Sequence, residues 1–77
     1  MNTDKYTKPD GKCYSFVKSE QLANVGVTTE PGETLHELMN GDYELYSVMG
    51  TPYVIMKVVS NETVQGLIEK KSVIPVV

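Results

Sequence analysis

The chain has 77 residues, a net charge of −3 and a single cysteine, which is enough for one small domain and excludes an internal disulfide bond. No apolar run approaches the roughly 18 residues that a membrane span needs, and the first residues lack the basic and apolar stretches of a signal peptide. We therefore expect a single domain over residues 1–77, without a membrane segment, in the reducing cytoplasm.

Charge is distributed unevenly along the chain. Residues 1–18 have a net charge of +2, residues 19–44 a net charge of −6, and residues 45–77 a net charge of +1. All seven cations are lysines, whereas bidentate recognition of phosphate or guanine is an arginine speciality. The composition therefore argues against a nucleic-acid partner, and the acidic block of residues 19–44 favours a basic protein partner.

The first third of the chain predicts one strand with irregular flanks. Residues 1–11 are polar, and we expect a flexible arm or a weak hairpin strand there. Lys12–Lys18 alternates in the manner of a strand, with Cys13 as a small core residue. A short helical turn over Ser19–Ala23 and an irregular link over Asn24–Thr29 are expected to follow.

A first helix is predicted to begin at Glu30-Pro31, because proline is favoured at the first helical position. Three apolar residues then follow the spacing i, i+3, i+4, and they are Leu35, Leu38 and Met39. Asn40-Gly41 is expected to end this helix. His36 falls off the apolar stripe, so we expect it to face solvent.

The stretch Asp42–Val59 is the strongest strand signal in the chain. Its two runs, Tyr43–Met49 and Tyr53–Val59, are rich in aromatic and β-branched residues and are separated by Gly50-Thr51-Pro52. We expect a hairpin around which the rest of the chain packs. One side of the second run is wholly apolar and is expected to face the core; it consists of Val54, Met56 and Val58.

A second helix and a last strand complete the prediction. Ser60 or Asn61 is expected to cap the helix, whose apolar stripe is Val64, Leu67 and Ile68. Ser72–Val77 is apolar and predicts a final strand. Pro75 lacks an N–H group, so this strand belongs at the edge of a sheet.

The predicted order is therefore β-α-β-β-α-β. It indicates an α+β fold, a small two-layer sandwich of about four mostly antiparallel strands with two short helices. The order is compatible with a ferredoxin-like split βαβ arrangement, and an irregular α+β sheet is the alternative.

No set of residues in the sequence predicts catalysis. His36 has no obvious catalytic partners, and Cys13 would need a base and an oxyanion site beside it. Glycine-rich phosphate loops and metalloprotease patterns are absent. One cysteine and one histidine do not make a structural zinc set, although carboxylates would complete a weaker one. We therefore expect no enzyme, no cofactor and no metal requirement for folding.

By elimination, the sequence favours a small regulatory or inhibitory protein that binds another protein. Phages and other mobile elements encode many such proteins, which act in the host cytoplasm, but this analogy rests on size and composition only. The expected contact residues are acidic side chains on solvent-facing surfaces and tyrosines of the hairpin, namely Glu33, Glu37, Asp42, Glu44, Tyr43, Tyr46 and Tyr53. The alternatives are a small nucleic-acid-binding domain that uses the tyrosine-rich hairpin face, and a subunit whose chemistry another chain completes.

A homodimer is also expected, because a short chain gains from burying apolar surface against a copy of itself. The expected interface is the apolar end of the chain, with Val73, Ile74, Val76 and Val77. In the competing interpretation, this segment completes the sheet of the monomer and Pro75 blunts its outer edge.

Overall fold

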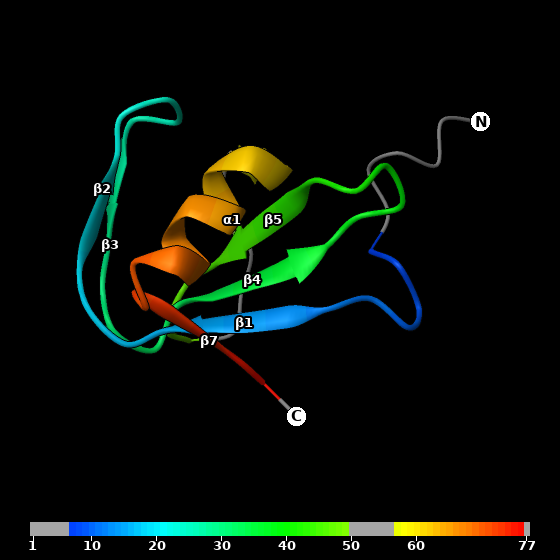
Figure 1. Cartoon of the computed structure of the whole chain (residues 1–77), viewed down its shortest axis with the longest axis horizontal. Helices are drawn as coiled ribbons and strands as arrows, with labels where there is room; N and C mark the ends of the chain where they lie inside the picture. The colour runs from blue at the N-terminus through cyan, green and yellow to red at the C-terminus, as the bar shows by residue number, and fades with distance from the viewer. Residues whose placement is uncertain (1–6, 50–56, 77) are drawn as a thin grey trace.

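The computed structural model describes residues 7–49 and 57–76, and these residues form antiparallel strands and one helix (Figure 1). In chain order the elements are β1 (Cys13–Phe16), β2 (Glu20–Leu22), β3 (Val27–Thr29), β4 (Thr34–Glu37), β5 (Tyr43–Tyr46), β6 (Val58–Val59), α1 (Asn61–Glu69) and β7 (Val73–Pro75). The strand-rich α+β character is confirmed. The prediction of two helices in ferredoxin-like order is wrong for the described residues.

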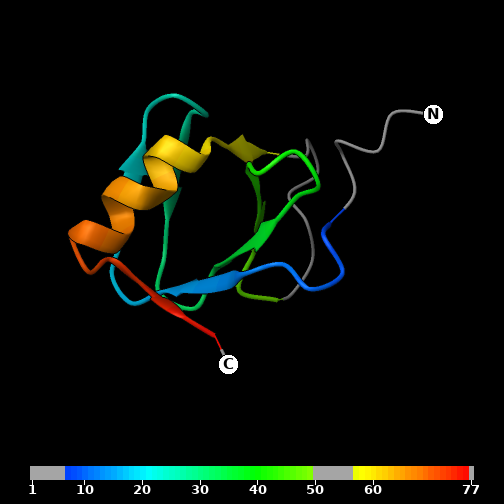
Figure 2. The same ribbon diagram turned by 45° about the vertical axis from the view of Figure 1, so that its right-hand side comes forward.

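Five strands form one sheet in the order β6-β5-β4-β1-β7, in which every pair is antiparallel. Strands β1, β4, β5 and β6 follow one another across the sheet, and β7 returns to pair with the other side of β1. The hairpin β2–β3 is inserted between β1 and β4 and forms a separate two-stranded sheet. Figure 2 shows that the larger sheet is curved, with α1 lying along one of its faces.

The core lies between this face of the sheet, α1 and the β2–β3 hairpin. Strand alternation places Tyr14, Phe16 and Leu35 on the inner face, where they are buried. Among the described residues, the core cluster consists of Tyr14, Phe16, Leu22, Leu35, Tyr43, Leu45, Val59, Val64, Leu67 and Val73. The sheet, the β2–β3 hairpin and α1 therefore all contribute side chains to a single apolar core.

The predicted helix over residues 30–40 is wrong, because this segment is a turn followed by β4. Glu33 donates its N–H to the carbonyl of Glu30 at 3.1 Å, and Gly32 has φ of +97°. Proline at the second position and a positive-φ glycine at the third are the signature of a type II turn. Leu35 then faces the core, whereas Leu38 is on the opposite face and outside the core cluster, so their helical spacing is accidental.

The segment predicted as a helical turn and an irregular link, residues 19–29, is the β2–β3 hairpin. Its register pairs Glu20 with Thr29 and Leu22 with Val27. At the turn, the carbonyl of Leu22 accepts the N–H of Gly26 at 2.9 Å, and Gly26 has φ of +72°. The sequence signal was this glycine, flanked on both sides by β-branched residues.

The predicted hairpin around Asp42–Val59 is confirmed in part. Tyr43 pairs with Val59 and Glu44 with Val58 in antiparallel register. Strand β5 ends at Tyr46, so the prediction that the first run continues as a strand over Ser47–Met49 is wrong. Most of the second run and its turn lie outside the described residues. The prediction that Val58 faces the core is wrong, since Val58 is 42% exposed and the neighbouring Val59 is buried.

The second predicted helix is confirmed as α1. Its N-cap is Ser60, whose side chain accepts the N–H of Thr63 at 3.3 Å. Its C-terminus is a Schellman motif, in which Ser72 N–H donates to the carbonyl of Leu67 and Lys71 N–H to that of Ile68. Lys71 occupies the left-handed position of this motif, with φ of +59°, where glycine is usual.

Strand β7 lies at the edge of the sheet, as its proline predicted. The N–H of Val76 donates to the carbonyl of Cys13, and that of Val17 to the carbonyl of Ser72. In this alternation the backbone groups of Val73 and Pro75 point away from β1. Pro75 therefore stands where its missing N–H costs no hydrogen bond within the sheet and leaves the edge without one donor.

At the other end of the chain, residues 1–6 lie outside the described residues. Thr7 forms a single β-bridge with Leu38, so the predicted N-terminal arm begins to pair with the sheet there.

The carboxylate of Glu20 joins three elements. It accepts hydrogen bonds from the buried hydroxyl of Ser72 and from Lys70 Nζ, the latter at 2.9 Å. These hydrogen bonds, first that of Ser72 and then that of Lys70, hold the pKa of Glu20 below its ordinary value. The backbone of Glu20 also exchanges hydrogen bonds with the hydroxyl of the buried Thr29. The hairpin is thus fastened to the end of α1 and the start of β7.

Replacing Lys71 by glycine should raise the free energy of unfolding by about 0.5–1 kcal/mol, because the left-handed conformation is costly for a residue with a Cβ atom. Urea denaturation measures the change. The matched control is Glu69→Gly, two residues earlier in the same helix with ordinary helical geometry, which should lose stability. If Lys71→Gly is neutral or destabilising, the αL position of the motif is wrong.

Replacing Ser72 by alanine should lower the free energy of unfolding at pH 7 by about 1 kcal/mol, because Glu20 loses a hydrogen bond inside the fold. The lowered pKa of Glu20 means that its ionised form stabilises the fold above its ordinary pKa. This contribution is lost as the pH falls through the lowered value. Urea denaturation at several pH values should show the difference between wild type and Ser72→Ala shrinking in acid, whereas exposed Ser19→Ala should show none.

Candidate functional site

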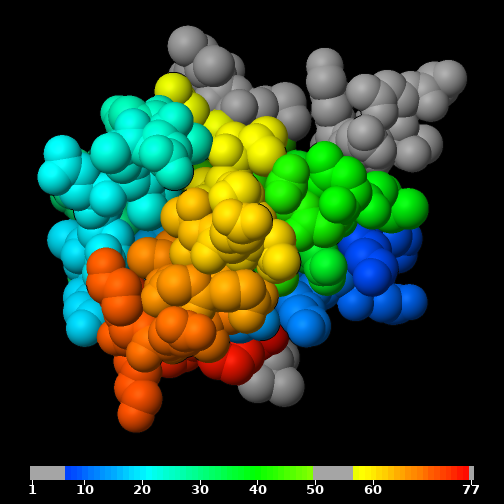
Figure 3. Space-filling model, turned by 45° about the horizontal axis from the view of Figure 1, so that its top comes forward, coloured from blue at the N-terminus to red at the C-terminus, as the bar shows by residue number. Residues whose placement is uncertain are grey.

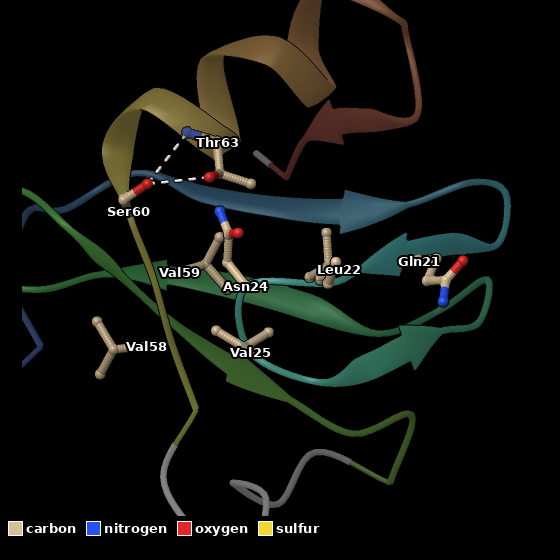
Figure 4. A pocket seen from close by; sticks show the side chains of 9 residues that line it. Gln21, Leu22, Asn24, Val25, Val58, Val59, Ser60 and Thr63 are labelled. Atoms are coloured by element: carbon tan, nitrogen blue, oxygen red, sulfur yellow. Dashed lines mark hydrogen bonds between the residues drawn. The ribbon is translucent and has the colours of Figure 1, made fainter.

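A pocket of about 360 Å³ lies between the β2–β3 hairpin, β6 and the first turn of α1 (Figure 4). Its apolar lining comes from the hairpin and from β6, and its polar lining comes from the hairpin and the helix start. The lining residues are Gln21, Leu22, Ala23, Asn24, Val25, Val58, Val59, Ser60 and Thr63. None of them carries a charge.

Local structure explains why the pocket forms. The turn of the hairpin places Asn24 and Val25 opposite the start of α1, and Figure 3 shows the hairpin and the helix side by side at the surface. Ser60 is held in place by its capping bond and by a contact of 2.9 Å between its hydroxyl and that of Thr63. The pocket therefore has a fixed apolar floor and a polar rim without titratable groups, which suits binding of an uncharged group better than chemistry.

A second group of polar residues lies on the outer face of the sheet, opposite the core. We call it the outer-face cluster, and it consists of Cys13, Thr34, His36, Glu44 and Tyr46. The sheet register makes Cys13 and Glu44 the cross-strand partners of His36 on either side. His36 Nε2 lies 3.0 Å from the Thr34 hydroxyl and 3.9 Å from Cys13 Sγ. The His36 and Tyr46 rings pack with centroids 4.3 Å apart.

The electrostatics of the cluster work against nucleophilic catalysis. Burial raises the pKa of the Cys13 thiol. Burial also lowers the pKa of His36, although the charge of Glu44 opposes this effect. A thiolate–imidazolium pair, which activates a cysteine nucleophile, needs shifts in the opposite directions. The arrangement therefore favours a neutral thiol beside a neutral imidazole.

Glu44 is 3% exposed, and its Oε2 is the one buried side-chain oxygen or nitrogen of the described residues that has no hydrogen-bond partner. Hydrogen bonding with Glu44 helps burial to raise the pKa of Tyr46. Within residues 7–49 and 57–76, no three histidine, cysteine or acidic side chains are placed to share one metal ion. An unpaired buried acceptor is costly, so this oxygen sets Glu44 apart from the other buried polar side chains of the described residues.

Two predictions about the outer-face cluster need correction. His36 was expected to face solvent from a helix, but it is half-buried on a strand between two others. Cys13 was expected in the core, but its strand position is on the outer face and it is half-buried. The helix predicted over residues 30–40 hid the strand position of His36. The error for Cys13 has another cause, because the alternation within β1 already sets Cys13 on the face opposite Tyr14 and Phe16.

The four carboxylates predicted to bind a partner are mostly engaged within the chain. Glu33 and Glu44 are 5% and 3% exposed, so the prediction that they lie on a solvent-facing surface is wrong. Glu37 is half-buried and accepts a backbone N–H just before β1 at 2.9 Å. Asp42 accepts the first N–H of α1 at 3.2 Å, where the helix dipole favours an anion.

The two tyrosines of the predicted binding face that the structure describes, Tyr43 and Tyr46, lie on opposite faces of the sheet. Tyr43 is 2% exposed, packs against the ring of Tyr14 at 5.8 Å, and has its pKa raised to about 12, chiefly by burial. Tyr43 is a core residue, and it has almost no exposed surface with which to contact a partner. Tyr46 is half-buried on the outer face, and Tyr53 lies outside the described residues.

The predicted dimer segment is divided between core and surface. Val73 is 3% exposed and belongs to the core cluster, whereas Ile74 and Val76 are 48% and 49% exposed. Val77 lies outside the described residues. The segment thus completes the sheet of the monomer, as the competing interpretation predicted. The side chains of Ile74 and Val76 remain exposed on the outer face.

Sequence reasoning missed the pocket. Leu22, Asn24 and Val25 had been placed in a helical turn and an irregular link, so no surface was assigned to them. The turn glycine Gly26 was the available signal for a hairpin, but a pocket depends on where the hairpin packs, and that position is fixed by contacts remote in sequence.

Comparison of the chain with protein-family models, with curated proteins and with solved structures finds no match. Among the residues that the structure describes, no helix is long and apolar enough to cross a membrane.

Proposed function

We propose that this protein acts by binding a segment of another protein at the pocket between the hairpin and α1, without chemistry of its own. The supporting observation is a concave, uncharged pocket of about 360 Å³ with an apolar floor, within the size range of ligand sites. A regulatory or inhibitory role is the simplest consequence of binding without catalysis and is part of the proposal.

The edge of β6 favours an extended partner segment. Among the described strands, β6 is the last on its side of the sheet, and the carbonyl of Lys57 accepts the N–H of Leu45 at 3.0 Å. In an antiparallel ladder the next residue, Val58, then directs its backbone N–H and C=O away from β5. A partner strand added to this edge would place an aliphatic side chain against the pocket floor, which is a common mode of peptide recognition.

A basic partner for the acidic block now has less support. Glu20 pairs with Lys70, Glu33 and Glu44 are buried, and Glu37 and Asp42 bind backbone N–H groups. The negative charge that the sequence concentrates in residues 19–44 is largely engaged by the chain itself. We therefore assign the partner segment an uncharged, aliphatic character.

The nucleic-acid alternative gains no support from the described residues. Base stacking needs exposed aromatic rings beside cations, but Tyr43 is buried and the pocket has no lysine in its lining. The alternative of a subunit completed by another chain finds no described group with the shifts of an activated nucleophile.

The test uses the full chain as bait in extracts of its native host, with two variants. Asn24→Asp places a charge at the pocket, and Asn40→Asp makes the same change at an exposed asparagine outside the pocket lining. A protein retained by wild type and by Asn40→Asp, resistant to nuclease, and lost at least tenfold with Asn24→Asp is the expected result. Equal retention by all three baits, or recovery of nucleic acid alone, contradicts the proposal.

Self-association through the outer face of β7 is a second part of the proposal, carried by the exposure of Ile74 and Val76. Exposed apolar side chains that lie close together favour association, and Val17, the residue directly after β1, is also 46% exposed. Light scattering at micromolar concentration should give a mass of two chains for wild type and of one chain for Ile74→Lys. A single-chain mass for wild type excludes a stable dimer. The control Val58→Lys should remain dimeric.

A further inference from the structure

The outer-face cluster brings together the only cysteine and the only histidine of the sequence. They are 23 residues apart in the chain, yet the β1–β4 register makes them direct cross-strand partners. Even a fully buried residue touches only on the order of 6–12 others, so two given residues of so short a chain meet by chance about one time in ten.

Cys13 Sγ and His36 Nε2 are 3.9 Å apart. A metal ion bonded at about 2.3 Å to sulfur and about 2.0 Å to nitrogen, as zinc is, holds these atoms about 3.5 Å apart at a tetrahedral angle and about 4.3 Å apart in a straight line. The observed separation is about 0.4 Å shorter than the straight-line value, which is the arrangement that an ion with only two ligands favours. A small side-chain movement would therefore present both donors to one ion, with the pairing of the two strands kept.

Glu44 provides an independent observation. Its buried Oε2 has no hydrogen-bond partner among the described residues, and its strand position is directly across from His36 on the same face. An imidazole that binds a metal through Nε2 carries its proton on Nδ1. Metal-bound histidines usually donate that second N–H to a carboxylate or carbonyl, and Glu44 is the charged acceptor on the neighbouring strand.

We propose that Cys13 Sγ and His36 Nε2 form a two-ligand site for Cu⁺, with Glu44 as the carboxylate that positions the imidazole. Thiolates select soft ions such as Cu⁺ and zinc, but zinc takes four ligands and no third histidine, cysteine or carboxylate of the described residues is within reach. Cu⁺ accepts two ligands. On binding, the thiol releases its proton to solvent and the sulfur–copper bond forms, with no change in oxidation state.

Thr34 contacts the same nitrogen of His36 that would bind the metal. Its hydroxyl lies 3.0 Å from His36 Nε2, the atom that the metal requires, so the hydroxyl and Cu⁺ compete for one nitrogen. Thr34→Val keeps a β-branched residue on the strand and removes the competitor. This variant should bind Cu⁺ severalfold more tightly than wild type, whereas any account based on general thiol affinity predicts no change.

The binding experiment uses the reduced full chain under argon, with Cu⁺ supplied as its coloured bicinchoninate complex. Wild type should withdraw one Cu⁺ per chain. Cys13→Ser should withdraw none, His36→Gln should bind at least tenfold more weakly, and Glu44→Gln should bind about tenfold more weakly because the imidazole loses its positioning carboxylate. The control Ser15→Ala, on the same face but outside the cluster, should match wild type. If His36→Gln binds as wild type does, the thiol alone holds the metal and the proposal fails.

A measurement on the wild-type chain guards against variants that fail to fold. Ag⁺ replaces Cu⁺ as a stable probe, and ¹⁵N NMR follows the two ring nitrogens of His36. The Nε2 resonance should move on addition of one equivalent of Ag⁺, and the Nδ1 resonance should report a protonated nitrogen. A change at neither nitrogen, or metal binding through Nδ1, overturns the proposed geometry. Retention of a protein partner at the pocket is a separate readout, so failure of one proposal does not affect the other.

Discussion

The pairing of β1 with β4 is the constraint on which the rest of the structure depends. The connection between these two strands is the β2–β3 hairpin, so their pairing brings both ends of the hairpin together at the sheet. Leu22, Val25 and Val27 of the hairpin then pack with the core on the inner face. At the base of the hairpin, Phe16 and Gly32 are tied by a hydrogen bond of 2.9 Å, and Phe16 N–H donates to Glu33. The same pairing sets Cys13 beside His36 on the outer face. One register thus creates both the wall of the pocket and the outer-face cluster.

Elements specified by neighbouring residues could be predicted from the sequence. Helix α1 has its cap at Ser60 and its apolar stripe within nine residues, and Pro75 marks an edge strand by its own chemistry. The segment over residues 30–40 failed because Leu35, Leu38 and Met39 fit a helical period by accident. Pro31-Gly32 carried the decisive local signal, since a positive-φ glycine after proline makes a turn. If the turn signal of Pro31-Gly32 is given more weight than the apolar spacing, the sequence predicts a strand at the position of β4.

The acidic block shows why a candidate surface is harder to predict than a strand. A cluster of carboxylates in the sequence suggested a surface for a basic partner, yet the structure directs them inward, to Ser72 and Lys70, and to backbone N–H groups. Such partners lie up to 52 residues away in the sequence, and no local sequence pattern predicts them. Net charge therefore describes the chain as a whole, whereas the chemistry of a surface depends on which charges the fold has already paired.

The two candidate sites differ in how completely the chain satisfies its own groups. At the pocket, the polar side chains of Ser60 and Thr63 are bonded to each other and to the helix backbone, so an incoming ligand finds mainly apolar surface and strand edge. At the outer-face cluster, one buried carboxylate oxygen of Glu44 stays unpaired beside a half-buried imidazole. An unpaired buried acceptor lowers stability unless a ligand-bound state supplies its donor. The unpaired oxygen of Glu44 therefore distinguishes this cluster from the pocket, where Ser60 and Thr63 already have partners within the chain.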